Sequence, residues 1–215
     1  HIKSLDFTRD EEHFYGDGRR LIQNLQRAAE RCGVLLDDYK VCLELGCGVG
    51  RLTVWLSEVL PKILAADISR LRLDLNQRAL RRFQRSNVEH HHIVTIDSLS
   101  NLPDFDAFFS IIVLQHNPPP LIIMLLKIIL RKLRPDGIAY FQVPTFIKNY
   151  TFRLDEYLRG TLESNHMEMH AIPQKLLFGI INDCGCELLE IREDPWTDSR
   201  EIISNSVFVK KTASR

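Results

Sequence analysis

The chain has 215 residues, of which 45% are hydrophobic and 26% are charged. These proportions exclude a disordered or fibrous chain, and the length predicts one domain or two small ones. The 28 Lys and Arg residues balance the 28 Asp and Glu residues, so no overall charge favours binding to nucleic acid or to an anionic membrane.

Cysteine usage and the longest apolar run indicate the protein's surroundings. The five cysteines are odd in number and have no regular spacing, so we expect free thiols in a reducing compartment, the cytoplasm. Cys184 and Cys186 are separated by one residue and have no second pair, so we expect no metal site. The apolar run 121–130 is shorter than the roughly 20 residues of a membrane span, so no membrane segment is predicted. The first residue is His1 rather than Met, which indicates a trimmed start or a longer protein.

Strand-type and helix-type segments alternate along the chain. Apolar residues that recur every three or four positions predict helices, and short continuous apolar runs predict buried strands. In chain order, the pattern predicts a helix at 19–32, a strand at 41–45, a helix at 52–60, a strand at 63–67, a helix at 69–85, strands within 88–96 and at 108–114, a helix at 120–133, a strand at 138–143, a helix at 173–184, and strands at 187–192 and 204–210. Ser69 is expected to cap the helix at 69–85.

This alternation predicts an α/β fold with a doubly wound, parallel sheet, because helical crossovers return the chain to start each strand in the same direction. The last two strands are expected to form an antiparallel pair at the sheet edge. Ligands of such sheets bind beyond the carboxyl ends of the strands. We therefore expect the functional residues just after the strands.

A glycine-rich motif separates the first predicted strand from the next helix. Gly46, Gly48 and Gly50 lie at this junction, where glycine permits a tight turn and lets a ligand approach the backbone. Asp67 ends the next predicted strand, where a carboxylate can accept hydrogen bonds from both hydroxyls of a ribose. We therefore favour a ligand-binding loop over a purely structural turn.

The motif resembles that of the class I S-adenosylmethionine-dependent methyltransferases. Residues 44–51, Glu-Leu-Gly-Cys-Gly-Val-Gly-Arg, are similar to the family's first motif, whereas dinucleotide-binding folds use the spacing G-x-G-x-x-G. The resemblance covers residues 41–143 and continues through the final helix and strands. It implies a Rossmann-like, seven-stranded sheet that is mostly parallel, with an antiparallel last strand and helices on both faces.

The resemblance implies binding of S-adenosylmethionine, with S-adenosylhomocysteine as the product. The methionine end would lie near residues 44–48 and the ribose on Asp67. Asp67-Ile-Ser69 resembles the second motif, in which Ile68 would line the adenine, and Asp97-Ser98 is the natural match to the third. The residues assigned to the cofactor in this way are Glu44, Gly46, Cys47, Gly48, Gly50, Arg51, Asp67, Ile68, Asp97, Ser98, Leu114 and Gln115.

Residues 1–215 are expected to form a single methyltransferase domain with four parts. These are an N-terminal leader and helix at 1–40, a cofactor-binding core at 41–143, a substrate lid insertion at 144–172, and a C-terminal helix and strand pair at 173–215. The lid is inferred because an irregular stretch of this length is more often a binding element than an ordinary connection.

Asn117-Pro118-Pro119 invites comparison with the Asn-Pro-Pro-aromatic signature of adenine N6-methyltransferases. Pro120 occupies the position of the stacking aromatic ring, which argues against base methylation. Rigid entry into the next helix explains the prolines. The runs 115–120, 141–145 and 167–173 instead resemble bacterial methyltransferases associated with surface-polysaccharide or other secondary biosynthesis.

Two histidines are the candidate catalytic bases. Transfer from an activated sulfonium depends mainly on positioning, and a base helps to remove the proton of a hydroxyl acceptor. His116 follows the fourth predicted strand, and His170 lies in the predicted lid; each could instead be a hydrogen-bonded structural residue. Candidate substrate-binding residues are His166 and, in the leader that can fold over the cofactor in this family, Tyr15 and Asp17. The adjacent histidines 90–92 cannot all face one metal ion, because successive strand residues point to opposite faces. We expect them to form the solvated start of a strand.

The sequence therefore predicts a methyltransferase that acts on a small molecule or glycan, at a hydroxyl. The alternatives are a protein or nucleic-acid N-methyltransferase and a non-catalytic methyltransferase-like binding domain. Zero net charge and the missing stacking ring make nucleic acid an unexpected partner, and the glycine spacing disfavours a nicotinamide dehydrogenase. No oligomeric state is predicted.

Overall fold

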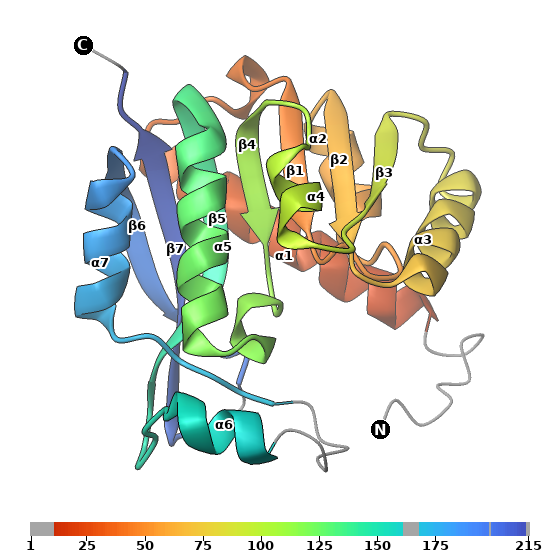
Figure 1. Ribbon diagram of the computed structural model, residues 1–215. Helices are drawn as coiled ribbons and strands as arrows, with labels where there is room; N and C mark the ends of the chain where they lie inside the picture. The colour runs from red at the N-terminus through yellow and green to blue at the C-terminus, as the bar shows by residue number, and fades with distance from the viewer. Residues whose placement is uncertain (1–10, 161–167, 198, 214–215) are drawn as a thin grey trace. The chain divides into compact units, whose positions relative to one another are not determined.

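The computed structural model describes residues 11–160, 168–197 and 199–213. The chain divides into two compact units, His1–Phe109 and Ser110–Arg215. The strands follow the order β3-β2-β1-β4-β5-β7-β6 in a seven-stranded sheet, and Figure 1 labels them. The predicted mixed α/β fold is therefore confirmed, while the prediction of a single domain stays a prediction.

The first unit contains four strands that run parallel to one another. β1 pairs with β2 and with β4, and β2 pairs with β3. Its elements are α1 (Glu11–Arg31), a 3-10 turn (Leu36–Asp38), β1 (Val41–Leu45), α2 (Thr53–Val59), β2 (Lys62–Asp67), α3 (Arg70–Arg82), β3 (Val88–His92), α4 (Ile96–Ser100) and β4 (Phe105–Ser110).

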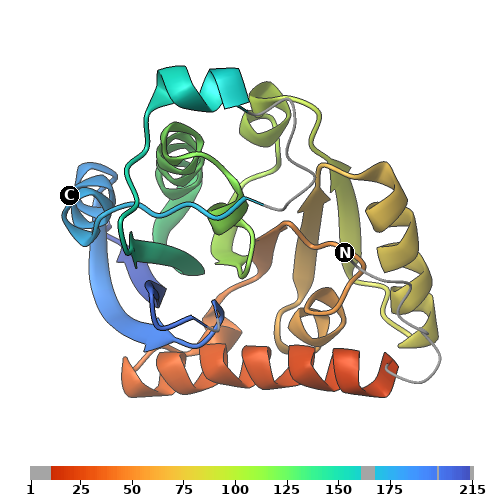
Figure 2. The ribbon, with the colours of Figure 1, turned by 90° about the horizontal axis from the view of Figure 1, so that it is seen from below.

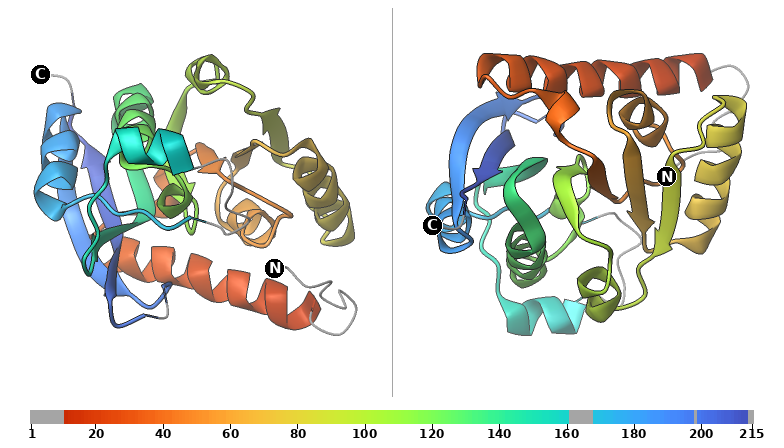
Figure 3. Two further views of the ribbon diagram at one scale, coloured as in Figure 1. Left: turned by 60° about the horizontal axis from the view of Figure 1, so that its bottom comes forward. Right: turned by 90° about the horizontal axis from the view of Figure 1, so that it is seen from above.

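Helices of the first unit cover both faces of its strands. α1 and α2 lie on one face and α4 on the other, while α3 flanks β3 (Figures 2 and 3). Tyr15 of α1 joins a buried cluster with Val54 of α2 and with Ala79 and Leu80 of α3. As predicted, Ser69 caps α3, and its side chain accepts a hydrogen bond from the Arg72 amide.

The second unit contains three antiparallel strands covered by two helices. Its elements are a 3-10 turn, η2 (Leu114–His116), followed by α5 (Pro119–Lys132), β5 (Leu133–Ile147), α6 (Leu154–Gly160), α7 (Gln174–Asp183), β6 (Cys186–Asp194) and β7 (Ile202–Lys211). β7 pairs with both β5 and β6. α5 and α7 lie on the same face of these strands (Figure 1).

Several predicted boundaries differ from the structure. The first helix begins at Glu11, so the predicted leader segment around Tyr15 is helical. β3 ends at His92, and the short helix α4 follows it. β4 ends at Ser110 because the chain turns at Ile112, whose φ is +60°; the prediction that a strand reaches residue 114 is wrong. β5 continues to Ile147, so the first residues of the predicted lid belong to a strand.

Two sequence-based expectations about composition can be compared with the structure. All five cysteines are free, which confirms the predicted free thiols. Within the described part of the chain, no helix combines the length and the apolar character that crossing a bilayer requires.

Candidate functional site

The three glycines of the predicted motif form a tight loop between β1 and α2. Gly46, Gly48 and Gly50 have φ angles of 73°, 52° and 93°, in the left-handed region that only glycine enters readily. The amides of Gly46 and Cys47 both donate to the Ala66 carbonyl, at 2.7 and 3.1 Å. These two hydrogen bonds therefore hold the loop at the end of β2. At the three glycines no side chain covers the backbone.

Asp67 connects this glycine loop to the start of α3. Its Oδ2 accepts a hydrogen bond from the Gly48 amide at 2.9 Å, and its Oδ1 accepts one from the Ser69 amide at 2.8 Å. The side chain is buried, and each carboxylate oxygen keeps lone-pair capacity for a further donor. The carboxylate thus fits its predicted role toward a ribose, and it also holds the loop in place.

Glu44 provides a buried acceptor beside the glycine loop. Its Oε2 has no hydrogen-bond partner among the described residues, and burial raises the pKa of its carboxyl to about 8, against an ordinary 4.5. A buried oxygen without a partner is costly unless a ligand supplies a donor. Glu44 and the bare glycine backbone therefore fit a ligand that carries an ammonium group, as the methionine end of S-adenosylmethionine does.

Asn76 of α3 supports the loop from behind and was missed by the sequence analysis. It is fully buried, and its Nδ2 donates to the Thr53 hydroxyl at 3.0 Å and more weakly to the carbonyls of Cys47 and Gly48. A Cβ at Gly50 would approach the Asn76 Cγ to 3.3 Å. The sequence did contain a sign of this role, because Asn76 is the one polar residue among the buried positions of α3.

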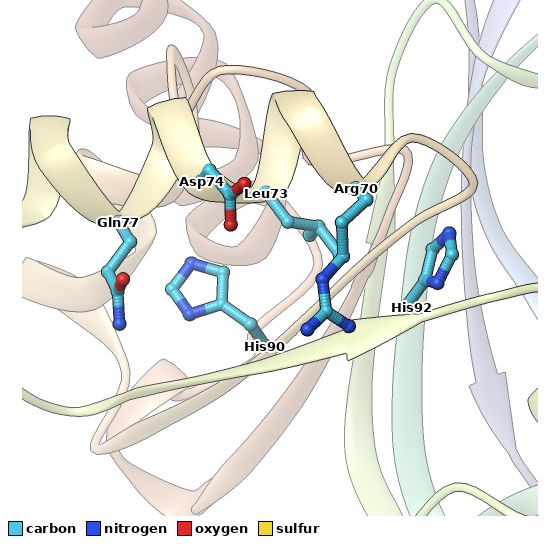
Figure 4. Close-up of a pocket in the computed structure, with 6 residues that line it drawn as sticks. All are labelled: Arg70, Leu73, Asp74, Gln77, His90 and His92. Atoms are coloured by element: carbon cyan, nitrogen blue, oxygen red, sulfur yellow. The ribbon is translucent and has the colours of Figure 1, made fainter.

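His90 connects Asn76 to a cavity between α3 and β3. Its Nε2 lies 3.1 Å from Asn76 Oδ1, and His92 projects toward the same side (Figure 4). The cavity has a volume of about 230 Å³ and is lined by Arg70, Leu73, Asp74, Gln77, His90 and His92. Residues 90–92 are half-buried, which corrects the expectation of a solvated strand. Among the described residues, no group of three His, Cys, Asp or Glu side chains could hold a metal.

The residues predicted to contact the adenine have mixed surroundings. Ile68 is 76% exposed, so its apolar side chain is accessible for packing against an adenine ring. Ser98 already bonds Thr95 in a capping box at the start of α4, and Asp97 is exposed on the same helix. Arg51, which was assigned to the cofactor without a specific contact, is half-buried next to the Phe14 ring, and burial lowers its pKa. The contacts of these four residues with the cofactor stay predictions.

The N-terminal candidates belong to α1 rather than to a free leader. Tyr15 is buried, its hydroxyl donates to the Val49 carbonyl at 3.3 Å, and its own carbonyl accepts from Trp55 Nε1 at 2.7 Å. Asp17 pairs with Arg20 on the same helix. The structure thus gives Tyr15 a role in supporting the loop, and substrate binding by either residue stays a prediction.

Leu114 and Gln115 of the second unit lie in the 3-10 turn η2 rather than at a strand end. Both are buried. Gln115 Oε1 accepts a hydrogen bond from Gln142 Nε2 at 2.8 Å, and Gln142 Oε1 accepts one from the Ile112 amide at 2.9 Å. Asn117 Nδ2 donates to the Val113 carbonyl at 2.9 Å, so this amide closes a turn. The predicted cofactor contacts of Leu114 and Gln115 stay predictions.

Both candidate bases, His116 and His170, contact Glu168. His116 Nδ1 donates to the Glu168 carbonyl at 2.8 Å, and His170 Nε2 lies 3.0 Å from the Glu168 carboxylate. The other ring nitrogen of His170 lies 2.7 Å from the Tyr150 hydroxyl. The structure therefore brings both predicted histidines into one network within the second unit. His166 lies outside the described residues.

Comparison with known proteins relates the sequence to one family. Residues 43–139 match the family model described as a methyltransferase domain. No curated protein matches the sequence.

Solved structures resemble the chain over most of its length. One is magnesium protoporphyrin IX methyltransferase (ChlM) from Synechocystis PCC 6803 with bound SAH, at a TM-score of 0.66 and 15% identity, covering 99% of this chain and 90% of that one. Another is an S-adenosylmethionine-dependent methyltransferase from Methanosarcina mazei, with a TM-score of 0.61 and 20% identity; the match covers 84% of this chain and 95% of that one. The [4+2]-cyclase SpnF matches with a TM-score of 0.66 and 14% identity, and the match covers 89% of this chain and 82% of that one. These TM-scores show that the chain shares the fold of these proteins, and the fold by itself does not define a reaction.

Proposed function

We propose that this chain is a class I methyltransferase and that it transfers the methyl group of S-adenosylmethionine to a hydroxyl of a small molecule or a glycan; the match of residues 43–139 to a methyltransferase domain and the fold support this. The donor supplies an already activated methyl group. The protein's own residues therefore have to bind the donor, orient the acceptor and take up a proton. We also propose a cytoplasmic location, because all five cysteines are free thiols.

The unpartnered Oε2 of Glu44 is the observation that carries the cofactor assignment. It lies in a buried carboxyl two residues before a loop of three glycines with positive φ. Glu44 would accept hydrogen bonds from the ammonium group, the glycine backbone would lie against the methionine end, and Asp67 would accept from the ribose. The two carboxylates can accept the hydrogen bonds that these contacts need. The glycines have no side chain that would keep the ligand from the backbone.

The histidine network supports a hydroxyl as the acceptor. A hydroxyl loses a proton as it is methylated, and an imidazole is a suitable acceptor for that proton near neutral pH. The second unit contains two imidazoles whose orientation is fixed by hydrogen bonds to Glu168. The turn-closing bond of Asn117 and the zero net charge leave base methylation without support.

Isothermal titration tests cofactor binding. We expect micromolar binding of S-adenosylhomocysteine and no binding of NAD. Asp67→Asn keeps the shape of the side chain and replaces one carboxylate oxygen with a donor, so it weakens both the acceptance of ribose hydroxyls and the bonds that the carboxylate accepts from the Gly48 and Ser69 amides. Unchanged affinity of Asp67→Asn would exclude the ribose contact.

A methyl-transfer screen tests the acceptor class. Radiolabelled S-adenosylmethionine is offered with hydroxyl-bearing metabolites, glycans, proteins and nucleic acids, using wild-type protein and the variants His116→Ala and His170→Ala. Transfer to a hydroxyl supports the proposal. Transfer only to protein or nucleic-acid nitrogen, or tight binding without any transfer, contradicts it.

A further inference from the structure

Three side chains of the second unit form a continuous hydrogen-bonded chain. The Glu168 carboxylate lies 3.0 Å from His170 Nε2, and His170 Nδ1 lies 2.7 Å from the Tyr150 hydroxyl. His170 is only 6% exposed, whereas Tyr150 and Glu168 are half-buried. The imidazole in the middle therefore has both nitrogens occupied and can exchange a proton with a bound molecule only through one of its two neighbours.

The chemistry of the three groups fixes the direction of the hydrogen bonds. An ionised carboxylate only accepts, so His170 Nε2 carries the proton that it donates to Glu168. Nδ1 of the neutral ring is then an acceptor, and the Tyr150 hydroxyl donates to it. The phenol oxygen donates its only proton in this bond and keeps lone-pair capacity for a donor from a bound molecule.

Three aromatic rings and a carboxylate surround His170. The ring centroids of Phe152, Tyr157 and Tyr150 lie 5.9, 5.7 and 6.0 Å from that of the imidazole in edge-type contacts, which fix the plane of the ring. Glu168 supplies the opposite charge at hydrogen-bond distance. Burial and Glu168 raise the pKa of Tyr150 to about 12, so its hydroxyl keeps its proton until it can pass that proton to His170.

We infer that Tyr150 is a further catalytic residue, which accepts the proton of the acceptor hydroxyl while it passes its own proton to His170. The inference rests on the proposed function. As the acceptor oxygen forms its bond to the methyl carbon, the carbon–sulfur bond breaks and its electron pair stays on sulfur. The acceptor proton moves to the Tyr150 oxygen, and the Tyr150 proton moves to His170 Nδ1. Glu168 stabilises the resulting imidazolium, which later releases its proton to water.

His116 has a positioning role in this arrangement. Its Nδ1 donates to the Glu168 carbonyl, and its Nε2 lies 3.4 Å from Gln115 Nε2. The side chain thus holds the main chain of Glu168 next to η2. Because the Glu168 carboxylate orients His170, His116 acts on the proton chain through Glu168.

Kinetics of Tyr150→Phe test the inference on an acceptor that the wild type methylates at a hydroxyl. We expect kcat to fall by about 10²- to 10⁴-fold, the usual contribution of acid–base catalysis, while the Kd for S-adenosylhomocysteine stays unchanged. The slowing of wild-type kcat in D₂O should be lost in the variant. Tyr140→Phe is the matched control, because Tyr140 lies on β5 against Phe208 and outside the chain of three, and it should keep wild-type kcat. A wild-type kcat in Tyr150→Phe would overturn the inference and leave the proposed function intact.

Nuclear magnetic resonance provides a readout that does not depend on turnover. Nitrogen shifts of the imidazoles should show opposite neutral tautomers, with the proton on Nε2 of His170 and on Nδ1 of His116. Tyr150→Phe should shift the Nδ1 signal of His170 and leave that of His116 in place. A His170 proton on Nδ1 would overturn the relay. Wild-type protein that binds S-adenosylhomocysteine and methylates only nitrogen would overturn the proposed function and the relay together.

Discussion

Gly18 of α1 lies directly against the main chain of Arg51, the residue that follows the glycine loop. A Cβ atom at position 18 would overlap the Arg51 carbonyl oxygen and lie 2.9 Å from its carbonyl carbon. Backbone cannot yield as a flexible side chain does. The absence of a side chain at Gly18 therefore allows α1 to support the loop, together with the hydrogen bond from Tyr15 to Val49.

The variant Gly18→Ala should separate α1 from the loop. We expect the free energy of unfolding to fall by about 1–3 kcal/mol, the usual cost of overpacking, and S-adenosylhomocysteine to bind more weakly. Chemical denaturation and titration calorimetry measure the two effects. Gly16→Ala is the control, because nothing lies within 4 Å of its added Cβ; it should stabilise the helix by about 0.5–1 kcal/mol. Equal binding by both variants would refute a role of this contact in cofactor binding.

Replacing Asn76 with alanine should loosen the glycine loop from the opposite side. The change removes the donor to Thr53 and the acceptor for His90 in a fully buried position. We expect a loss of about 1–3 kcal/mol in stability, as for other buried groups left without partners, and weaker binding of S-adenosylhomocysteine. Gln77→Ala is the control, because Gln77 is the neighbouring amide and is exposed. It should leave both the stability and the affinity for S-adenosylhomocysteine unchanged. A variant Asn76→Ala with wild-type affinity would show that the loop holds its shape without this support.

Features with a local cause could be predicted from the sequence. The mostly apolar β1, the glycines of the loop and the cap at Ser69 each depend on residues a few positions apart. The structure confirms the strand at 41–45 and the cap. The assignment of Asp67 to the end of β2 is confirmed for the same reason.

Features that depend on distant partners could not be predicted. The apolar sequence at 108–114 reads as one strand, yet the chain leaves the sheet after Ser110. Its unusual conformation at Ile112 is compatible with a hydrogen bond from the Ile112 amide to Gln142, thirty residues later. Tyr150 was likewise overlooked as a catalytic residue, because its significance arises from its contact with His170 and not from a local pattern.

The variant Gln142→Leu tests this distant partner. Its amide group accepts from the Ile112 amide and donates to Gln115 and to Ser204, all in buried surroundings. We expect the free energy of unfolding to fall by about 1–3 kcal/mol, because leucine leaves these polar groups without partners. The imidazole signals of His116 should also shift, since Gln115 would lose its anchor. Gln174→Leu, at the exposed start of α7, serves as the comparison, and an equal effect of both variants would contradict the prediction.

Glu44 should make the protein less stable as the pH rises. Its native pKa of about 8 exceeds the ordinary 4.5, so between these values the native state binds more protons than the unfolded state. Stability therefore falls with increasing pH across this window. Glu44→Gln cannot ionise and should remove this part of the pH dependence. Urea denaturation across the pH range measures it, and identical slopes for the two proteins would contradict the raised pKa.

Binding of the cofactor should reverse the protonation of Glu44. At neutral pH the free protein keeps this carboxyl mostly protonated, since its pKa is about 8, whereas an ammonium group beside it favours the ionised form. Binding of S-adenosylhomocysteine should therefore release a proton, and affinity should increase as the pH rises toward about 8. Calorimetry in buffers of different ionisation enthalpy counts the released protons. Glu44→Gln should bind without this buffer dependence, and a wild type that behaves in the same way would show that the ammonium group does not lie beside Glu44.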